Sequence, residues 1–329
     1  MMKKILNSPE EYADQALQGM CQAFPHLYAQ SGESGRVITR AIPAKDKPGI
    51  VSGGGSGHLP TFAGYVGPGL LDACAVGNVF AGPAVMDCMA AIRAADNGKG
   101  VLLLFGNYGG DKMNFAMAAE MLEAEGIRTR TVLACDDVGS ASRDERLKRR
   151  GVAGLIYAYK VAGARAEQPG ATLDDVAEIA RRALDNTVTL GVALSPCTVP
   201  EAGKPTFTLA DNEMEIGMGI HGEPGIRRGP LLTADTLADE MLTTLCEDSA
   251  LEAGDRVAVM VNSLGATPLE ELFILWRRIQ SALRTRNISW LPPQIGRYAT
   301  SMEMAGASLT LMKLDDELAS LLATPVVSP

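Results

Sequence analysis

The sequence lacks the features that would place the protein on nucleic acid or in a membrane. Its 30 Lys and Arg are outnumbered by 39 Asp and Glu, and the formal net charge of −9 would repel a polyphosphate backbone. Apolar runs such as 101–105 are far shorter than the roughly 20 residues of a membrane span. Glu10 and Glu11 interrupt the N-terminus before any export signal could form. We therefore expect a cytoplasmic protein that binds neither nucleic acid nor membrane.

Metal and nucleotide motifs are also missing. The six cysteines show no Cys-x-x-Cys spacing and no clustering with histidine of the kind that holds zinc. We expect reduced, structural cysteines and no metal site. No Gly-Lys-Ser/Thr closes a P-loop, and no segment fits the dinucleotide fingerprint G-x-G-x-x-G. The sequence therefore contains no recognised ATP-binding motif.

Chain length and the order of the apolar segments predict two α/β domains. A single core rarely grows beyond about 250–300 residues, and this chain has 329. Strand-like runs alternate with helical patterns, which favours a mostly parallel sheet. Helical spacing at 173–184, with Thr172 as N-cap, precedes a strand-like run at 188–194. We expect domains over 1–188 and 189–329, with a ligand site at their junction. Further expected strands are 49–52, 101–105, 129–134, 256–261 and 308–314, and further helices are 113–124, 269–285 and a terminal amphipathic helix.

A glycine-rich segment, GIVSGGGSGHLP at 49–60, leads from a strand-like run to His58. Glycines let backbone N–H groups approach a ligand closely, so a loop of this kind suits an anionic or hydroxyl-rich ligand. An ordinary tight loop with an incidental histidine explains the same residues about equally well. The segment alone therefore leaves binding and plain structure as open alternatives.

A second candidate loop, Gly-Asn-Tyr-Gly-Gly-Asp, follows the expected strand 101–105 and ends at Asp111. Open α/β sheets place their ligands beyond the carboxyl ends of the strands. A carboxylate there can take a proton from a hydroxyl as it attacks phosphorus. The alternative is that Asp111 caps the following helix, and the residues alone favour capping.

Only three histidines occur in the chain. His221 lies in the loop Ile-His-Gly-Glu-Pro-Gly, a rigid setting typical of catalytic or ligand-binding histidines. A hydrogen-bonded turn histidine is the alternative. His26 follows a proline without a glycine loop, and we interpret it as structural. Because a neutral imidazole can add to a ketone as a hemiaminal, the residues support a small-molecule site between two α/β domains.

Nearly the whole chain resembles the substrate-binding K subunit of dihydroxyacetone kinases. The resemblance rests on four segments in this order: SGGGSGH, NYGGD, SPCTVPEAGKPTFTLADNEMEIGMGIHGEPGI and VNSLGATPLEEL. It implies that His221 binds a short ketose covalently, while His58 and Asp111 position and deprotonate it. It also implies that Gly55, Ser56 and Gly57 line the same site.

The resemblance further implies a division of labour between chains. In the family, a helical L subunit or domain carries the nucleotide and its magnesium. No such segment follows residue 329, so we expect no cofactor in this chain. Mg-ATP, or Mg-ADP recharged by a phosphotransferase-system protein, is expected on a partner L subunit. The family also usually forms homodimers, which we expect here.

Two positions depart from the family pattern. Leu59 stands where members usually carry a glutamate, and Gly106 stands where they carry a lysine. Lost polar groups at a substrate site change which substrate is preferred. We therefore expect a four-carbon ketose such as erythrulose, bound with Gly106 at the site. Lys112 could supply the missing cation instead, which would favour dihydroxyacetone.

A regulatory protein is the alternative of another class. A ketose sensor would bind sugar and dock on a partner without kinase turnover. Such a protein needs the covalent histidine but has little use for a base at Asp111. An unrelated α/β enzyme with a bound cofactor is disfavoured because no nucleotide fingerprint occurs.

Overall fold

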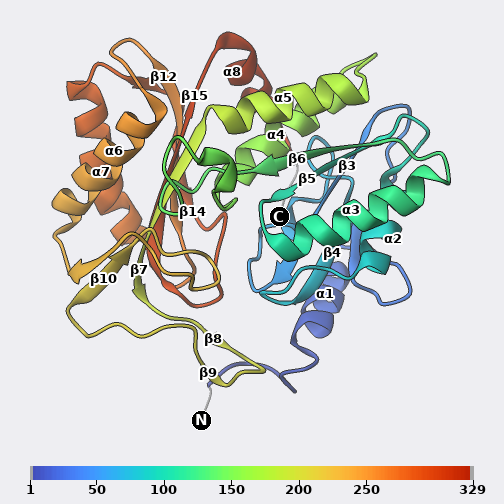
Figure 1. Ribbon diagram of the computed structural model, residues 1–329, viewed down its shortest axis with the longest axis horizontal. Helices are drawn as coiled ribbons and strands as arrows, with labels where there is room; N and C mark the ends of the chain where they lie inside the picture. The colour runs from blue at the N-terminus through green and yellow to red at the C-terminus, as the bar shows by residue number, and fades with distance from the viewer. Residues whose placement is uncertain (1–2, 327–329) are drawn as a thin grey trace.

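The computed structural model describes residues 3–326 and shows two β-sheets separated and flanked by helices (Figure 1). Helices α2 and α3 cover the outer face of the first sheet, and α6 and α7 cover that of the second. Helices α4 and α5 lie between the two sheets. The α/β class predicted from the sequence is confirmed. The helices are α1 (Tyr12–Ala23), α2 (Val85–Ala95), α3 (Gly109–Glu123), α4 (Gly154–Ala166), α5 (Leu173–Asp185), α6 (Ala234–Ser249), α7 (Leu269–Thr285) and α8 (Asp316–Ala323), with short 3-10 turns η1 (Ala63–Tyr65) and η2 (Arg146–Lys148).

The first sheet has the strand order β1-β2-β4-β3-β5-β6. Its four strands β4, β3, β5 and β6 are parallel, while β1 and β2 join antiparallel at one edge. Alternate residues serve two cores: Ile50 and Leu102 face α4 and α5, whereas Val51 faces α2 and α3. The strands are β1 (Tyr28–Ser31), β2 (Val37–Arg40), β3 (Gly49–Ser56), β4 (Ala73–Val79), β5 (Val101–Gly106) and β6 (Thr129–Ala134).

The second sheet has the order β11-β10-β7-β15-β12-β13, and β14 also pairs with β12. It is mostly antiparallel, with parallel pairing only of β12 with β13 and β14. The mostly parallel sheet that we predicted therefore occurs only in the first half. The strands are β7 (Thr187–Ser195), β10 (Glu213–Ile216), β11 (Arg227–Pro230), β12 (Arg256–Ser263), β13 (Ser289–Trp290), β14 (Gln294–Gly296) and β15 (Ala305–Lys313); a small separate hairpin joins β8 (Thr198–Val199) and β9 (Lys204–Pro205).

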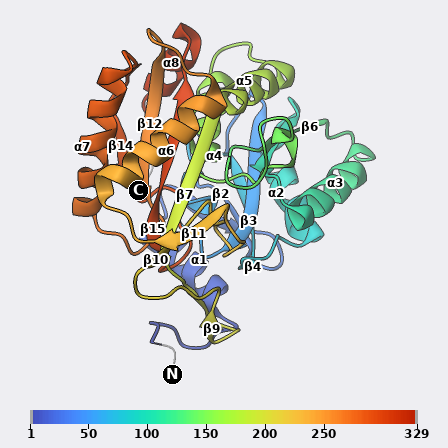
Figure 2. The same ribbon diagram turned by 60° about the vertical axis from the view of Figure 1, so that its left-hand side comes forward.

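The two sheets share one layer of helices. Helix α4 is buried almost along its whole length, as its apolar sequence requires, and α5 starts with the predicted Thr172 cap, completed by Asp175 as a capping box. One continuous core joins the first sheet, α4, α5, α8 and the inner face of the second sheet, where it includes Met260 and Met312. Figure 2 shows this layer with both sheets to its sides. The division at residues 188 and 189 stays a prediction, because the core continues across it.

Several predicted boundaries shift in the structure. Strand β3 runs to Ser56, so the predicted glycine loop is wrong for Gly53 to Gly55, which lie within a strand. Helix α3 begins four residues earlier than expected and contains Asp111 in its first turn. Strand β15 begins at Ala305. Within residues 3–326, no helix is long and apolar enough to cross a membrane.

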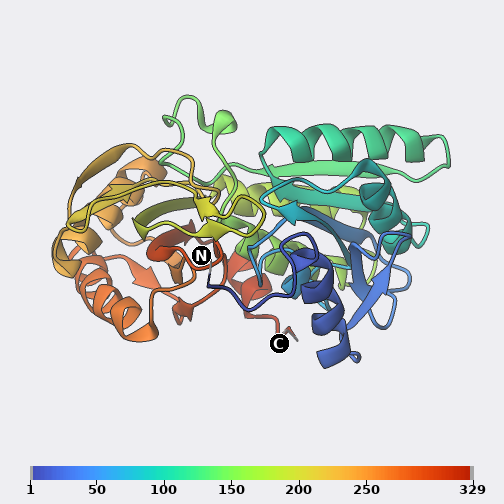
Figure 3. The ribbon, with the colours of Figure 1, turned by 90° about the horizontal axis from the view of Figure 1, so that it is seen from below.

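The N-terminal segment crosses the lower side of the molecule. Seen from below, it runs from α1 toward the second half (Figure 3). There Lys4 pairs with Glu303 at 2.5 Å, and the Glu303 carboxylate also accepts a hydrogen bond from the N–H of Thr198, the first residue of the small hairpin. The segment thus connects the two halves close to the loop that contacts His58.

Candidate functional site

Strand β3 delivers His58 into a closed environment. Its Nδ1 lies 2.7 Å from the Thr300 carbonyl oxygen, and because a carbonyl only accepts, Nδ1 carries the proton. The ring is 1% exposed, and Nε2 is buried without a hydrogen-bond partner. Burial, followed by the neighbouring His221, lowers the pKa of His58 to about 3. His58 is therefore a neutral imidazole with a free acceptor at Nε2.

The glycines before His58 are required by close packing. A side chain at Gly55 would meet the backbone of Phe80 and Ala81 at 2.7–2.9 Å. Gly57 has φ +98, which L-residues rarely adopt, and its carbonyl accepts from the Met302 N–H at 2.7 Å. Ser56 donates its hydroxyl to the Gly77 carbonyl at 2.8 Å. The segment is thus locked in place, and its predicted contact with substrate stays a prediction.

The loop after β10 presents His221 against a carboxylate. Its Nδ1 lies 2.8 Å from Glu223 Oε1, and its backbone N–H donates to Glu223 Oε2 at 3.0 Å. Burial alone would raise the pKa of Glu223, but its hydrogen bond to His221 and the charge of that ring outweigh burial and lower it to about 2. An ionised carboxylate only accepts, so Nδ1 donates to Glu223, and in the neutral ring the lone pair is on Nε2.

The two histidines face each other within an aromatic enclosure. Their ring centroids are 4.9 Å apart. Phe80 stacks on His58 at 4.9 Å and meets His221 edge-on at 5.3 Å, and Tyr108 packs edge-on against His221 at 4.8 Å. The structure therefore brings together the histidines that are 163 positions apart in the sequence.

Asp111 points into the same region from the first turn of α3. Its Oδ1 is buried without a partner, and burial raises the pKa of its carboxyl to about 6, against a lowering effect of His221. Helix α3 has no side-chain cap, and its N-cap residue is Tyr108, so the capping alternative for Asp111 is not what the structure shows. Opposite the carboxylate lies Gly82, where an added side chain would come within 3.1 Å of Oδ1.

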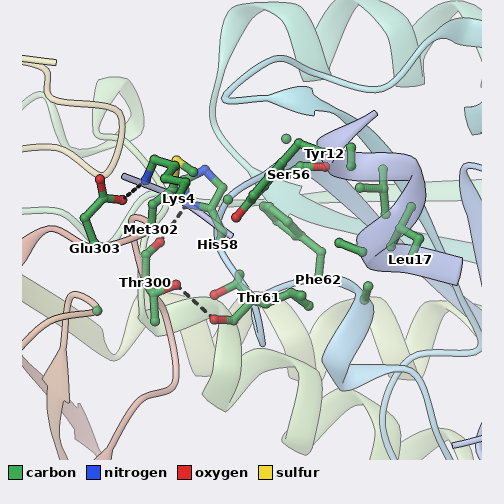
Figure 4. Close-up of a pocket in the computed structure, with 18 of the residues that line it drawn as sticks. Lys4, Tyr12, Leu17, Ser56, His58, Thr61, Phe62, Thr300, Met302 and Glu303 are labelled. Atoms are coloured by element: carbon green, nitrogen blue, oxygen red, sulfur yellow. Dashed lines mark hydrogen bonds and ion pairs between the residues drawn. The ribbon is translucent and has the colours of Figure 1, made fainter. Parts of the chain in front are cut away.

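The two positions that depart from the family pattern, Gly106 and Leu59, differ in burial and in location. Gly106 is buried, and a side chain there would meet the Tyr108 ring at 2.9 Å. Leu59 is 44% exposed and borders a cavity of about 550 Å³ beside His58 (Figure 4). The walls of that cavity come from α1, the end of β3 and the segment from Thr300 to Glu303. Neither position places a charged group at the histidines.

Sequence reasoning missed several residues of the site. Glu223 stands within the quoted motif, and its spacing of two from His221 in a glycine turn was a usable signal. Phe80 and Gly82 lie in the connection between β4 and α2 without any pattern around them. Thr300 acts through its backbone carbonyl, which a side-chain motif cannot indicate. His26 is exposed and lies outside the site. Within residues 3–326, no three His, Cys, Asp or Glu side chains gather as a metal ion would need.

Comparison with known proteins identifies the family. The model of the Dak1 domain matches residues 18–329. The chain belongs to the Dak1 family. Over 316 residues it is 43% identical to the PTS-dependent dihydroxyacetone kinase 1, dihydroxyacetone-binding subunit DhaK, of Listeria innocua, covering 96% of this chain and 95% of that one. It is 42% identical over 332 residues to the L-erythrulose 1-kinase of Mycolicibacterium smegmatis, covering 100% of this chain and 58% of the relative.

The fold also matches a solved structure over nearly its whole length. The dihydroxyacetone kinase operon co-activator Dha-DhaQ superposes with a TM-score of 0.89 at 31% identity, covering 97% of both chains. The family resemblance inferred from the four sequence segments is confirmed. The same fold thus occurs in proteins named as kinases or kinase subunits and in one named as a co-activator.

Proposed function

We propose that this Dak1 chain is the substrate-binding and catalytic subunit of a ketose kinase. It holds a short ketose covalently on Nε2 of His221. The observation that carries the proposal is the pairing of His221 with Glu223, which leaves Nε2 unprotonated beside a neutral His58. Asp111 completes the set as a buried carboxylate whose Oδ1 has no other partner.

The covalent step follows from the proton positions. Nε2 of His221 adds its lone pair to the ketone carbon, the C=O π bond opens, and the oxygen takes up a proton from solvent, which reaches the partly exposed ring, to give a hemiaminal. Glu223 offsets the positive charge left on the ring, as a carboxylate does for a catalytic imidazolium. Nε2 of His58 accepts a hydrogen bond from a substrate hydroxyl.

The phosphoryl step uses Asp111 as general base. The carboxylate takes the proton of a terminal hydroxyl as its oxygen attacks phosphorus. A partner L subunit supplies the phosphoryl group from Mg-ATP, or from Mg-ADP recharged by a phosphotransferase-system protein. This chain then acts as a homodimer that binds sugar and holds it for the partner.

The preferred substrate is a four-carbon ketose such as erythrulose. Leu59 and Gly106 leave the site without the glutamate and lysine expected at these positions. Relatives of nearly equal identity include a dihydroxyacetone-binding subunit at 43% and an L-erythrulose 1-kinase at 42%, so the choice rests on the residues of the site. Competition between dihydroxyacetone and each erythrulose enantiomer for the chain tests it. A clear preference for dihydroxyacetone would contradict it and would favour Lys112 as the replacing cation.

The covalent anchor is tested with a ketose labelled with ¹³C at the carbonyl. Bound to wild type, the carbonyl signal should be replaced by that of a tetrahedral carbon, and the intact protein mass should rise by one sugar. His221→Ala should show neither change. His26→Ala is the matched control, since this histidine lies outside the site, and should behave as wild type. Absence of any adduct with wild type would remove the hemiaminal from the proposal.

A regulatory function is the second candidate, supported by the structural match to an operon co-activator at 97% coverage. A sensor of this kind would form the same adduct but support no phosphoryl transfer. Asp111 separates the two functions. Phosphorylation by wild type with its L subunit, lost in Asp111→Asn while the adduct remains, supports the kinase. Adduct formation without turnover by any L subunit supports the sensor.

A further inference from the structure

Arg150 lies beneath the His221 loop although it comes from the other half of the chain. It follows η2 in the connection between β6 and α4. Its guanidinium donates from Nε to Asp137 Oδ2 at 2.8 Å and from Nη2 to the Gly217 carbonyl at 2.9 Å. Its third nitrogen, Nη1, lies 3.8 Å from Glu223 Oε2. One side chain thus contacts the start of the loop and the carboxylate that holds His221.

The loop is built around this contact. A side chain at Gly219 would overlap both the Glu223 carboxylate and the Arg150 guanidinium. Gly217, whose carbonyl binds Arg150, has φ +81 and so favours glycine. These two glycines let the loop wrap closely over the guanidinium, and the wrapped loop orients Glu223 toward His221.

The charges around Arg150 are almost enclosed. Its side chain is 12% exposed and that of Asp137 is 4% exposed. Burial raises the pKa of Asp137 to about 7, while Arg150 acts to lower it. The other ionisable groups facing this cluster are Glu223, Tyr108 and Asp136. Arg150 is the cation placed among these acidic groups, and its fixed fork suits it to hold two loops at once.

We propose that Arg150 is a positioning residue for the nucleophile. By holding Gly217 and facing Glu223, it keeps the Glu223 carboxylate on Nδ1 of His221 and so maintains the tautomer with a free Nε2. The catalytic use of that tautomer rests on the proposed function. The tautomer itself is a property of the chain without any ligand, so it can be measured independently.

The test is ¹⁵N NMR of histidine-labelled protein. With three histidines in the sequence, substitution of His26 and His58 assigns the signals of His221. In the pH range where the His221 ring is neutral, wild type should show Nδ1 protonated and Nε2 unprotonated. In Arg150→Met combined with Asp137→Asn, which avoids a buried unpaired carboxylate, the two nitrogen signals should move toward each other as tautomers mix. Asp137→Asn alone should keep the wild-type pattern.

Adduct formation gives the second readout. We expect it to slow about 10–100-fold in the double variant, as when groups that orient a metal-binding histidine are removed. Arg149→Met is the matched control. Arg149 is a buried neighbour that pairs with Asp248 through two bonds of 2.8 and 2.6 Å, so its loss disturbs packing without touching the His221 loop.

The outcomes separate the inference from the proposed function. A folded double variant with the wild-type tautomer and adduct rate overturns the role of Arg150. An equal tautomer change in Arg149→Met also overturns it, because the effect would then be general loosening. If wild type shows the expected tautomer but forms no adduct, the proposed function fails while the positioning role stands.

Discussion

His58 and His221 lie 4.9 Å apart, yet their surroundings give the same side chain different chemistry. His58 is fully enclosed, and its hydrogen bond goes to the uncharged Thr300 carbonyl, so that burial holds its pKa at about 3. His221 is only partly buried, and its hydrogen bond goes to the carboxylate of Glu223. A positive charge is costly on the first ring because burial removes its hydration, whereas the second ring has a carboxylate as its hydrogen-bond partner.

This difference assigns roles without reference to any relative. An imidazole that cannot become charged serves as a hydrogen-bond acceptor. An imidazole that faces a carboxylate can form a bond through Nε2 and carry the resulting charge. When two neighbouring titratable groups lie in environments that affect their ionisation differently, the two groups commonly have different chemical roles. The backbone oxygen and the carboxylate oxygen that contact the rings therefore matter as much as the rings.

The largest loss of the difference between the two histidines is expected when the Glu223 carboxylate beside His221 is removed. Glu223→Gln presents an amide that can donate to Nδ1 and so favours the tautomer with Nε2 protonated. We expect adduct formation to slow about 10²–10⁴-fold, the cost of a wrong histidine tautomer. The rate is measured from the ¹³C signal of the labelled ketose. Glu201→Gln, at an exposed position, is the matched control, and an unchanged rate in Glu223→Gln would remove the carboxylate from the mechanism.

Asp111→Asn should leave both histidines as they are and remove only the base. With a partner L subunit present, we expect kcat to fall about 10²–10⁴-fold while the adduct still forms. In wild type, kcat should rise with pH through about 6, because the base must be ionised and its pKa is raised to that value. Loss of the adduct in Asp111→Asn, or a pH profile flat through 6, would contradict this separation of roles.

His58→Gln tests how much the neutral histidine contributes to ketose binding. Glutamine retains a polar side chain but not the neutral ring with its acceptor at Nε2. A buried hydrogen bond of this kind contributes about 1–3 kcal/mol, so we expect ketose affinity to fall about 10–100-fold while an adduct remains detectable at high ketose concentration. Titration followed by the ¹³C signal measures this. Complete loss of the adduct would show that His58 takes part in bond formation.

The smallest expected effect is on stability. Because the folded-state pKa of His58 lies near 3 and an unfolded histidine titrates near 6.5, the unfolded chain binds the extra proton between these values. The contribution of His58 is thus present above pH 6.5 and is lost as pH falls toward 3. Denaturant unfolding of His58→Gln should show a pH dependence weaker than wild type by about 1–3 kcal/mol between pH 7 and 4. Parallel curves would contradict the assigned protonation.

Side-chain motifs predicted residues that the structure brings together at the candidate site, and local patterns predicted α3, α5, α7 and α8 but not α1, α2, α4 or α6. Glycines close to a histidine or an aspartate pointed to His58, Asp111 and His221. Such residues can be recognised in a sequence because their predicted roles depend on the type of side chain. The Thr300 carbonyl could not be predicted, since any residue supplies one and its position depends on a contact 242 positions away. Gly53 to Gly55 were misassigned for a related reason: their strand pairs with β4, and the backbone of Ala75 approaches Gly53 closely, so their conformation depends on a later segment of the chain.

The single core shared by both sheets has a consequence for the timing of turnover. Because α4 and α5 pack on both sheets at once, a closing motion of the two halves over a ligand would disturb the core that they share. Under the proposed function, the sugar stays bound at His221, and the partner chain that carries the phosphoryl donor must dock beside it. We therefore expect the encounter lifetime of the two chains, rather than a closing motion within this one, to set the speed of the cycle.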